Sequence, residues 1–345
     1  MEITKADGWG GTTPPLTALE AGQLAMVQIL LVAIGAGAAA ALLFASIATG
    51  SLIATLLFYL ASLPILLAAM GWGHLAGLLG ALLAATGLGL TLGFYFFLSF
   101  LFGVGLPAWW LGYLALLGRA VATNGSGGDM EWYPIGRLVF WAAIIGATVV
   151  GVAVLSFGTD KESFQTELRT TFERALLAQG QTPIPGRTDN RRVIDILVVA
   201  LPPAAAVLLT ILNTFNVWLA GRIVNVSGRL RRPWPDLSEM TLPGLTPGVL
   251  AAAIAGSFLP DLPGLLSSVL AASLFMAYAM MGFAVLHAVT RGAGGRALVL
   301  TGSYFAVIIL GWPILAMSLL GLAETAFNIR ARFASPTAGP PTTPT

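Results

Sequence analysis

The segment AGQLAMVQILLVAIGAGAAAALLFASIATG, residues 21–50, opens the stretch that decides the fold. From Ala21 to Gly118 the chain contains no Asp, Glu, Lys or Arg. A helix needs about 20 apolar residues to cross the roughly 30 Å hydrocarbon core of a bilayer. Strands of a membrane barrel would alternate polar and apolar residues, whereas this stretch is apolar on every face. The sequence therefore predicts several transmembrane helices joined by short turns.

Turn residues divide this stretch into four predicted spans. Thr49-Gly50-Ser51 and Gly71-Trp72-Gly73 mark two breaks, and a glycine-rich segment from Gly87 to Gly93 marks a third. The spans that result cover roughly residues 24–48, 52–70, 73–92 and 94–117.

The second half of the chain alternates apolar segments with charged ones. After a polar loop at 119–137 we predict a span at roughly 138–157, an amphipathic helix at about 159–179 and a span at roughly 193–219. Pro202-Pro203 should kink or break that span. From Leu245 to Val289 we predict two helices with a turn at Asp261, the first of them short, or alternatively a re-entrant half-helix. The last span is expected at roughly 297–323.

Together these segments predict an all-α, polytopic transmembrane helical bundle with about eight to nine spans and one surface amphipathic helix. We expect a flexible N-terminal lead at 1–20, a single transmembrane domain at 21–332 and a disordered Pro/Thr tail at 333–345. Within that domain, residues 158–192 form an amphipathic segment outside the membrane. The protein is expected in the bacterial inner membrane.

Composition excludes several classes of chemistry. The chain has 57% apolar residues, 9% charged residues, no cysteine and two histidines. A thiol site is therefore impossible, and two histidines alone do not close a zinc site. There is no Walker loop and no pair of membrane aspartates. We expect no enzymatic activity, no cofactor and no metal.

The arginines lie beside spans rather than in a patch suited to nucleic acid. The expected partners are the lipid bilayer, other membrane subunits and an unidentified small molecule. Arginines next to spans at 119–137 and 220–247 place these two loops in the cytoplasm by the positive-inside rule, with 158–192 outside.

Three polar residues within or beside spans are candidate ligand-binding residues: His74, Asn213 and Asn216. The two asparagines lie three residues apart and so share one helix face. Amides in a span either join helices or line a cavity, and the sequence leaves both readings open. His74 is either a site residue or a headgroup-level histidine bonded to a carbonyl.

Aromatic and basic residues next to spans are the predicted interfacial anchors. They are Trp132, Tyr133, Arg137, Arg231, Arg232, Trp234 and Arg291.

Small residues recur every fourth position along the first span. Ala33, Gly37, Ala41 and Ala45 form one smooth stripe, which allows another helix to approach closely. The stripe serves either as a docking surface or in ordinary packing within the bundle.

Four segments carry a resemblance to a known family. They are LPILLAAMGWGH (63–74), EWYPIGR (131–137), GRLRRPWPD (228–236) and AVLHAVTRG (284–292). With them the chain resembles the YybS-like family of predicted bacterial membrane proteins, a domain of unknown function, over about residues 24–332. That family is in turn remotely similar to the substrate-binding subunits of energy-coupling-factor transporters. The resemblance implies a ligand site within the bundle and a first helix that docks a coupling subunit through its small residues. The chain departs from those subunits by having more than their usual six spans.

Two functions follow as hypotheses. The first is a small-molecule-binding or transport subunit, which requires an enclosed pocket with convergent polar groups. The second is a non-transporting membrane scaffold in envelope assembly or division, which requires a filled bundle and exposed partner surfaces at 158–192 and 220–247.

Overall fold

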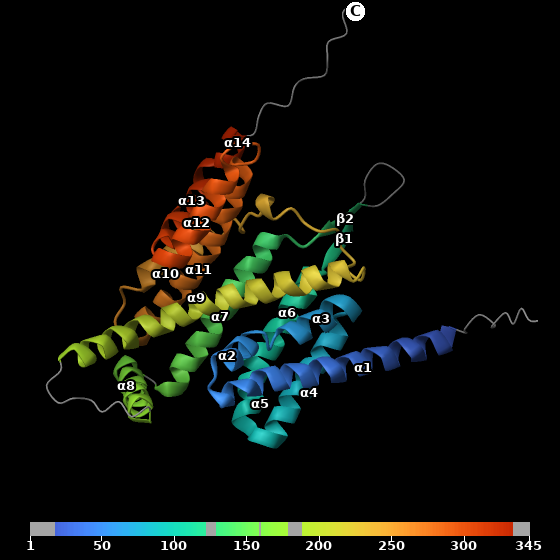
Figure 1. Ribbon diagram of the computed structural model, residues 1–345, viewed down its shortest axis with the longest axis horizontal. Helices are drawn as coiled ribbons and strands as arrows, with labels where there is room; N and C mark the ends of the chain where they lie inside the picture. Colours follow the sequence, from blue (N-terminus) through green and yellow to red (C-terminus); the bar gives the residue numbers. More distant parts are fainter. Residues whose placement is uncertain (1–17, 122–128, 159, 179–187, 334–345) are drawn as a thin grey trace, which may run out of the picture.

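The computed structural model describes residues 18–121, 129–158, 160–178 and 188–333. The predicted N-terminal lead, up to residue 17, and the predicted Pro/Thr tail, from residue 334, lie outside these residues. Figure 1 shows an all-α bundle, which confirms the predicted fold class.

Seven helical segments of the described chain are long and apolar enough to cross a membrane. They are Gly22–Thr49, Leu52–Trp72, His74–Leu92, Phe94–Ala115, Ile135–Phe157, Ile196–Val226 and Asp261–Val289. The apolar segments that complete the bundle are shorter: Thr246–Gly256, Arg296–Leu310 and Pro313–Phe327.

The four spans predicted in the charge-free stretch are confirmed. Glycines with positive φ begin the third and fourth spans, because Gly73 (φ 112°) and Gly93 (φ 108°) each precede a new helix. The helical elements are α1 (Ala18–Ala45), η1 (Ser46–Thr49), α2 (Leu52–Tyr59), α3 (Leu63–Trp72), α4 (His74–Leu92), α5 (Phe94–Phe100), η2 (Leu101–Gly105) and α6 (Leu106–Ala115).

The polar loop after α6 contains two short strands that the sequence analysis did not predict. β1 (Gly118–Val121) pairs antiparallel with β2 (Asp129–Trp132). Arg119 lies opposite Glu131 in this register, and their side chains form an ion pair at 2.6 Å. The pairing gives backbone N–H and C=O groups of the two strands hydrogen-bond partners where the chain leaves the helical bundle.

The predicted amphipathic helix is present as α8 (Lys161–Ala178), which follows α7 (Ile135–Phe157). Its buried residues Phe164 and Leu168 pack with Val154 of α7 and with Leu262 and Leu265. This part of its apolar face is covered by the protein's own chain, so α8 caps the bundle at this end.

Helix α9 (Thr188–Val226) runs through Pro202-Pro203 as one continuous helix (Figure 1), so the chain does not break there, and the kink predicted as the alternative stays a prediction. Each proline removes one backbone donor, and neighbouring helices can compensate for this in membrane proteins. Ala206 and Thr210 of α9 pack closely against Gly146 of α7, where a Cβ would lie 3.1–3.2 Å from both residues. This contact holds α9 against α7 directly beyond the prolines.

The two helices predicted around Asp261 are confirmed as α10 (Thr246–Gly256) and α11 (Asp261–Val289). Asp261 has φ 57°, which allows the sharp turn between them. A short helix η3 (Leu237–Glu239) lies in the loop before α10.

The predicted single span at 297–323 is wrong. The structure divides it into α12 (Arg296–Leu310) and α13 (Pro313–Phe327), and α14 (Ile329–Phe333) follows. Gly311 adopts φ 72°, and Pro313 then starts a new helix. At 1.5 Å per residue each of these helices measures only about 22 Å, short of the roughly 30 Å hydrocarbon core.

Several loops meet at one end of the bundle (Figure 1). Arg232 of the loop between α9 and α10 donates to the carbonyls of Ala115 and Tyr133, beside the hairpin. Arg330 of α14 donates to the carbonyls of Ser238 and Met240. The loops at 119–137 and 220–247 therefore share an end, as the predicted topology requires; which side of the membrane it faces stays a prediction.

Candidate functional site

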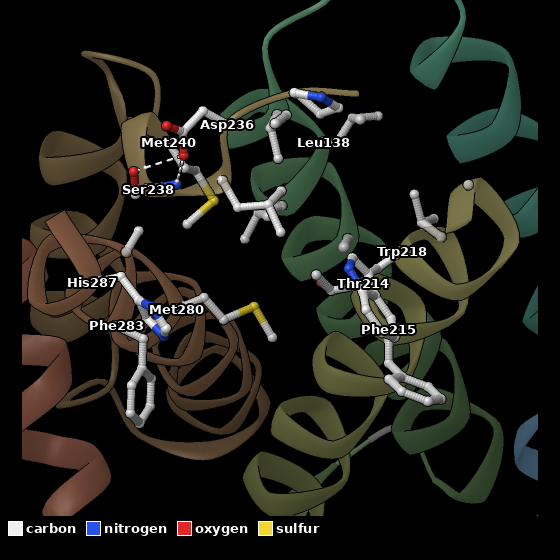
Figure 2. Close-up of a pocket in the computed structure, with 18 of the residues that line it drawn as sticks. Leu138, Thr214, Phe215, Trp218, Asp236, Ser238, Met240, Met280, Phe283 and His287 are labelled. Atoms are coloured by element: carbon white, nitrogen blue, oxygen red, sulfur yellow. Dashed lines mark hydrogen bonds between the residues drawn. The ribbon is translucent and has the colours of Figure 1, made fainter. Parts of the chain in front are cut away.

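A cavity of about 630 Å³ lies between α7, α9 and α11, beneath the loop that connects α9 to α10. Its volume falls within the range of about 300–1,000 Å³ that is usual for ligand pockets. Figure 2 shows Thr214, Phe215 and Trp218 of α9 on one side of the open space and Met280, Phe283 and His287 of α11 on the other, with Met280 reaching across it.

The cavity is deep and its interior is apolar. On α9 its lining runs from Ile211 to Gly221, and on α11 from Met276 to His287. Because a helix rises 1.5 Å per residue, Ile211 lies about 22 Å below the end of α9 at Val226. The inner wall consists of residues such as Val139, Ala142 and Met276. The cavity therefore extends from the loop end of the bundle into the membrane-spanning part.

The loop that covers the cavity is held by ion pairs. Arg291 donates to Asp236 Oδ2 at 2.8 Å and also to the Ser238 hydroxyl. Hydrogen bonds from Arg291 and from Ser238 lower the pKa of Asp236 to about 2, so this carboxylate stays charged at neutral pH. Figure 2 shows Asp236, Ser238 and Met240 together at the rim.

A second ion pair fixes the same loop from the C-terminal side. Glu324 is buried, with 4% of its surface exposed, and accepts from Arg330 Nε at 2.8 Å. The other guanidinium nitrogens of Arg330 donate to Ser238 O at 2.7 Å and Met240 O at 3.2 Å. We call Glu324, Arg330 and these two carbonyls the C-terminal clamp. It determines where the loop lies over the cavity.

Two arginines in the cavity wall have no such carboxylate. Arg232 is half-buried, and burial lowers its pKa. Its Nη1 donates to backbone carbonyls, while its buried Nε has no hydrogen-bond partner in the part of the chain that the structure describes. Arg296, at the start of α12, also lines the cavity. In the described part of the chain, no carboxylate forms an ion pair with either guanidinium.

One side of the cavity is bounded by α12. Tyr304 stacks on Phe283 with ring centroids 4.6 Å apart, and its hydroxyl lies 3.1 Å from His287 Nε2. Phe215, Trp218 and Tyr304 each keep more than 40% of their surface exposed although they line the cavity. These three rings leave the apolar wall of the cavity incompletely covered on the side of α9 and α12.

The three predicted ligand-binding residues do not converge. Asn216 is buried and donates to Tyr59 O at 2.8 Å, which joins α9 to the end of α2. Asn213 is partly exposed, and neither asparagine lines the cavity. His74 is exposed at the start of α4, with its ring 5.4 Å from that of Tyr113. A ligand role for these residues stays a prediction.

Asn216 supports a first testable prediction. Replacing Asn216 with leucine leaves the Tyr59 carbonyl without a donor and should cost about 1 kcal/mol of stability, the usual scale of an interhelical hydrogen bond in a membrane protein. Thermal unfolding in mild detergent measures this cost. Asn213→Leu is the matched control and should unfold close to the wild-type temperature; an equal cost for both variants would contradict the helix-joining role.

The small-residue stripe of α1 is partly used inside the bundle. Ala33 is fully buried, and a Cβ on Gly37 would lie 2.8 Å from the carbonyl oxygen of Gly80 on α4. This half of the stripe faces α4, while Ala41 and Ala45 are partly exposed. A docking role of the stripe toward another subunit stays a prediction.

The predicted anchors gather at the loop end, several of them in cation–π pairs. Arg137 lies over the ring of Tyr133 and Arg232 over that of Trp132, both at 5.9 Å, and Trp234 receives Arg222 at 5.3 Å. Arg231 is exposed beside them, and Arg291 pairs with Asp236. This end of the bundle thus carries the mixture of rings and cations that is typical of a membrane interface.

These features define a class: a polytopic α-helical membrane protein whose bundle contains a deep, partly open apolar cavity with a cationic rim. The chain belongs to the family described as predicted membrane protein (DUF2232), whose model matches residues 38–325. No curated protein and no solved structure matches the chain.

Proposed function

We propose that the protein binds a small molecule in this cavity, as a binding or transport subunit of the bacterial inner membrane. The observation that supports this best is the cavity itself, which combines a pocket-sized volume, an apolar interior and polar groups at one rim. The residues around it are otherwise closely packed, and Tyr278, Val269 and Leu274 of α11 are fully buried. A purely structural bundle would have no need to keep this space open.

The scaffold hypothesis has less support from the geometry. It requires a filled bundle and an exposed partner surface on the amphipathic segment. The buried Phe164 and Leu168 of α8 are instead covered by α7, α9 and the start of α11.

A cavity-filling substitution tests the proposal. Thr214 lines the cavity from α9, so Thr214→Trp places an indole in the binding space. We expect a small molecule that co-purifies with the wild type in mild detergent to be lost from this variant, as measured by mass spectrometry of the extracted ligand.

Thr148→Trp provides the matched control. Thr148 is exposed on α7, and its hydroxyl donates to the carbonyl four residues earlier, as that of Thr214 does. The control should keep the ligand. Equal ligand content in the two variants, or no ligand in the wild type, would overturn the proposed function.

A further inference from the structure

We infer that the cavity takes an amphiphile with an anionic headgroup. This inference rests on the proposed function and names the chemical class of its ligand. It follows from how charge and apolar surface are distributed along the cavity.

The charge lies at one end of the cavity. Among the described residues, the lining contains three arginines, Arg232, Arg291 and Arg296, and one carboxylate, Asp236. Asp236 pairs with Arg291, so the positive charge of the other two is not balanced within the described part of the wall. All four residues belong to the loop end of the bundle, in the loops before α10 and α12 or at the first residue of α12.

Arg232 is the residue that points most directly to an anion. A half-buried guanidinium has lost much of its hydration and gains most from a charged acceptor. Within the described residues, the partners of Arg232 are backbone carbonyls and the Trp132 ring, and its Nε is unpaired. A phosphate or carboxylate group would supply the missing acceptor and the missing charge.

The rest of the cavity fits an apolar tail. Below the arginines the lining changes to methionine, aromatic and aliphatic side chains, including Met276, Met280 and Phe215. Methionine walls adapt to flexible apolar ligands because the side chain is unbranched and polarizable. The lining on α9 from Ile211 to Gly221 covers about 15 Å at 1.5 Å per residue, which matches half of a roughly 30 Å hydrocarbon core. A small anion without a tail would leave this surface uncovered.

The exposed rings on α9 and α12 mark the side from which such a ligand would enter. Phe215 and Trp218 belong to the span Ile196–Val226, Tyr304 belongs to the shorter apolar helix α12, and all three side chains are more than 40% exposed. An amphiphile could enter from the bilayer with its headgroup held at the arginines throughout. An amphiphile taken from water would enter at the loop end, and both sources present the same chemistry.

The test measures headgroup preference with defined probes. The full chain, stripped of lipid in detergent, is incubated with dioleoyl phosphatidylglycerol, dioleoyl phosphatidylcholine or oleate, and the retained molecules are counted by native mass spectrometry. The fraction of wild-type protein that retains one anionic molecule should be at least about tenfold larger than the fraction that retains phosphatidylcholine. This ratio is the scale expected for a charge-assisted hydrogen bond. Arg232→Gln should bring the preference close to unity.

The neighbouring Arg231→Gln is the matched control, because Arg231 is exposed and lies outside the cavity lining. It should keep the wild-type preference. Arg232 also anchors the loop, so Arg296→Gln serves as a second variant that keeps those anchoring bonds and should lower the preference as well. Equal effects of Arg231→Gln and the two cavity variants, or equal retention of phosphatidylglycerol and phosphatidylcholine, would overturn the inference.

The probes also distinguish the sources and the two proposals. Retention of phosphatidylglycerol alone indicates a bilayer lipid, and retention of oleate alone indicates an amphiphile from water. Displacement of either by inorganic phosphate would show that no tail is needed and would overturn the inference. If the wild type holds a neutral or zwitterionic ligand that Thr214→Trp removes, the inference fails while the proposed function stands.

Discussion

Replacing Arg330 with methionine is expected to lower the free energy of unfolding by about 3–5 kcal/mol, because it leaves the buried Glu324 carboxylate without its charge partner. Glu324 is 4% exposed and pairs with Arg330 at 2.8 Å. The same substitution removes the donors to Ser238 O and Met240 O. Thermal and denaturant unfolding in mild detergent would measure the loss.

Arg332→Met is the matched control for this prediction. Arg332 lies two residues further along α14 and is exposed, so its loss should change stability little. The double variant Glu324→Leu/Arg330→Met should recover part of the loss, because it removes the buried charge together with its partner. A single variant no less stable than Arg332→Met would show that the C-terminal clamp contributes nothing to the fold.

Arg330→Met should also weaken ligand binding in the cavity. Ser238 and Met240 line it, and the clamp holds their backbone. We therefore expect weaker retention of the co-purifying ligand even at temperatures where the variant stays folded.

Introducing a methyl group at the crossing of α11 and α13 is the second large effect that we expect. A Cβ on Gly282 would overlap the carbonyl oxygen of Met317, and a Cβ on Gly321 would overlap that of Tyr278. Backbone oxygens cannot move aside unless the whole helix shifts. Gly282→Ala and Gly321→Ala should each cost about 3 kcal/mol, at the upper end of the usual overpacking range. The hydrogen bond from Ser318 to Phe275 O should weaken with them.

Gly302→Ala is the control for the glycine variants. Gly302 lies on α12, and a Cβ added there would have no neighbouring atom within 4 Å, so alanine fits without a clash. Its higher helix propensity should leave stability unchanged or slightly raised. Unfolding temperatures that fall equally for Gly302→Ala and Gly282→Ala would show that the close crossing of α11 and α13 is not a source of stability.

The errors of the sequence analysis have identifiable physical causes. The apolar run from 297 to 323 looks like one span because hydropathy is summed along the chain, and Gly311 and Pro313 hardly change that sum. Of the kink or break predicted at Pro202-Pro203, the break does not occur, and α9 packs closely on α7 just beyond the prolines. Both errors concern where the chain changes direction between helices, and the apolar composition of a segment does not determine this.

The candidate site was less predictable than the fold. Asn213 and Asn216 stood out because amides are rare in spans, yet only the structure shows that Asn216 faces Tyr59 rather than the cavity. Glu324 was a usable signal, since it is a single acid at the end of an apolar helix. Its link to Ser238 and Met240 bridges about ninety residues and has no local pattern.

By itself the sequence determined that this is a helical, multi-pass membrane protein, where most of its spans lie and which loops share an end. These properties depend on local apolar runs, turn residues and alternating helix direction. Only the tertiary structure decided that α7, α9 and α11 leave a cavity and that the C-terminal clamp holds its cover. It also decided that Arg232 and Arg296 lie in the cavity wall without a carboxylate partner among the described residues. A cavity arises where surfaces of remote segments fail to fill the space between them, and that depends on how whole helices pack.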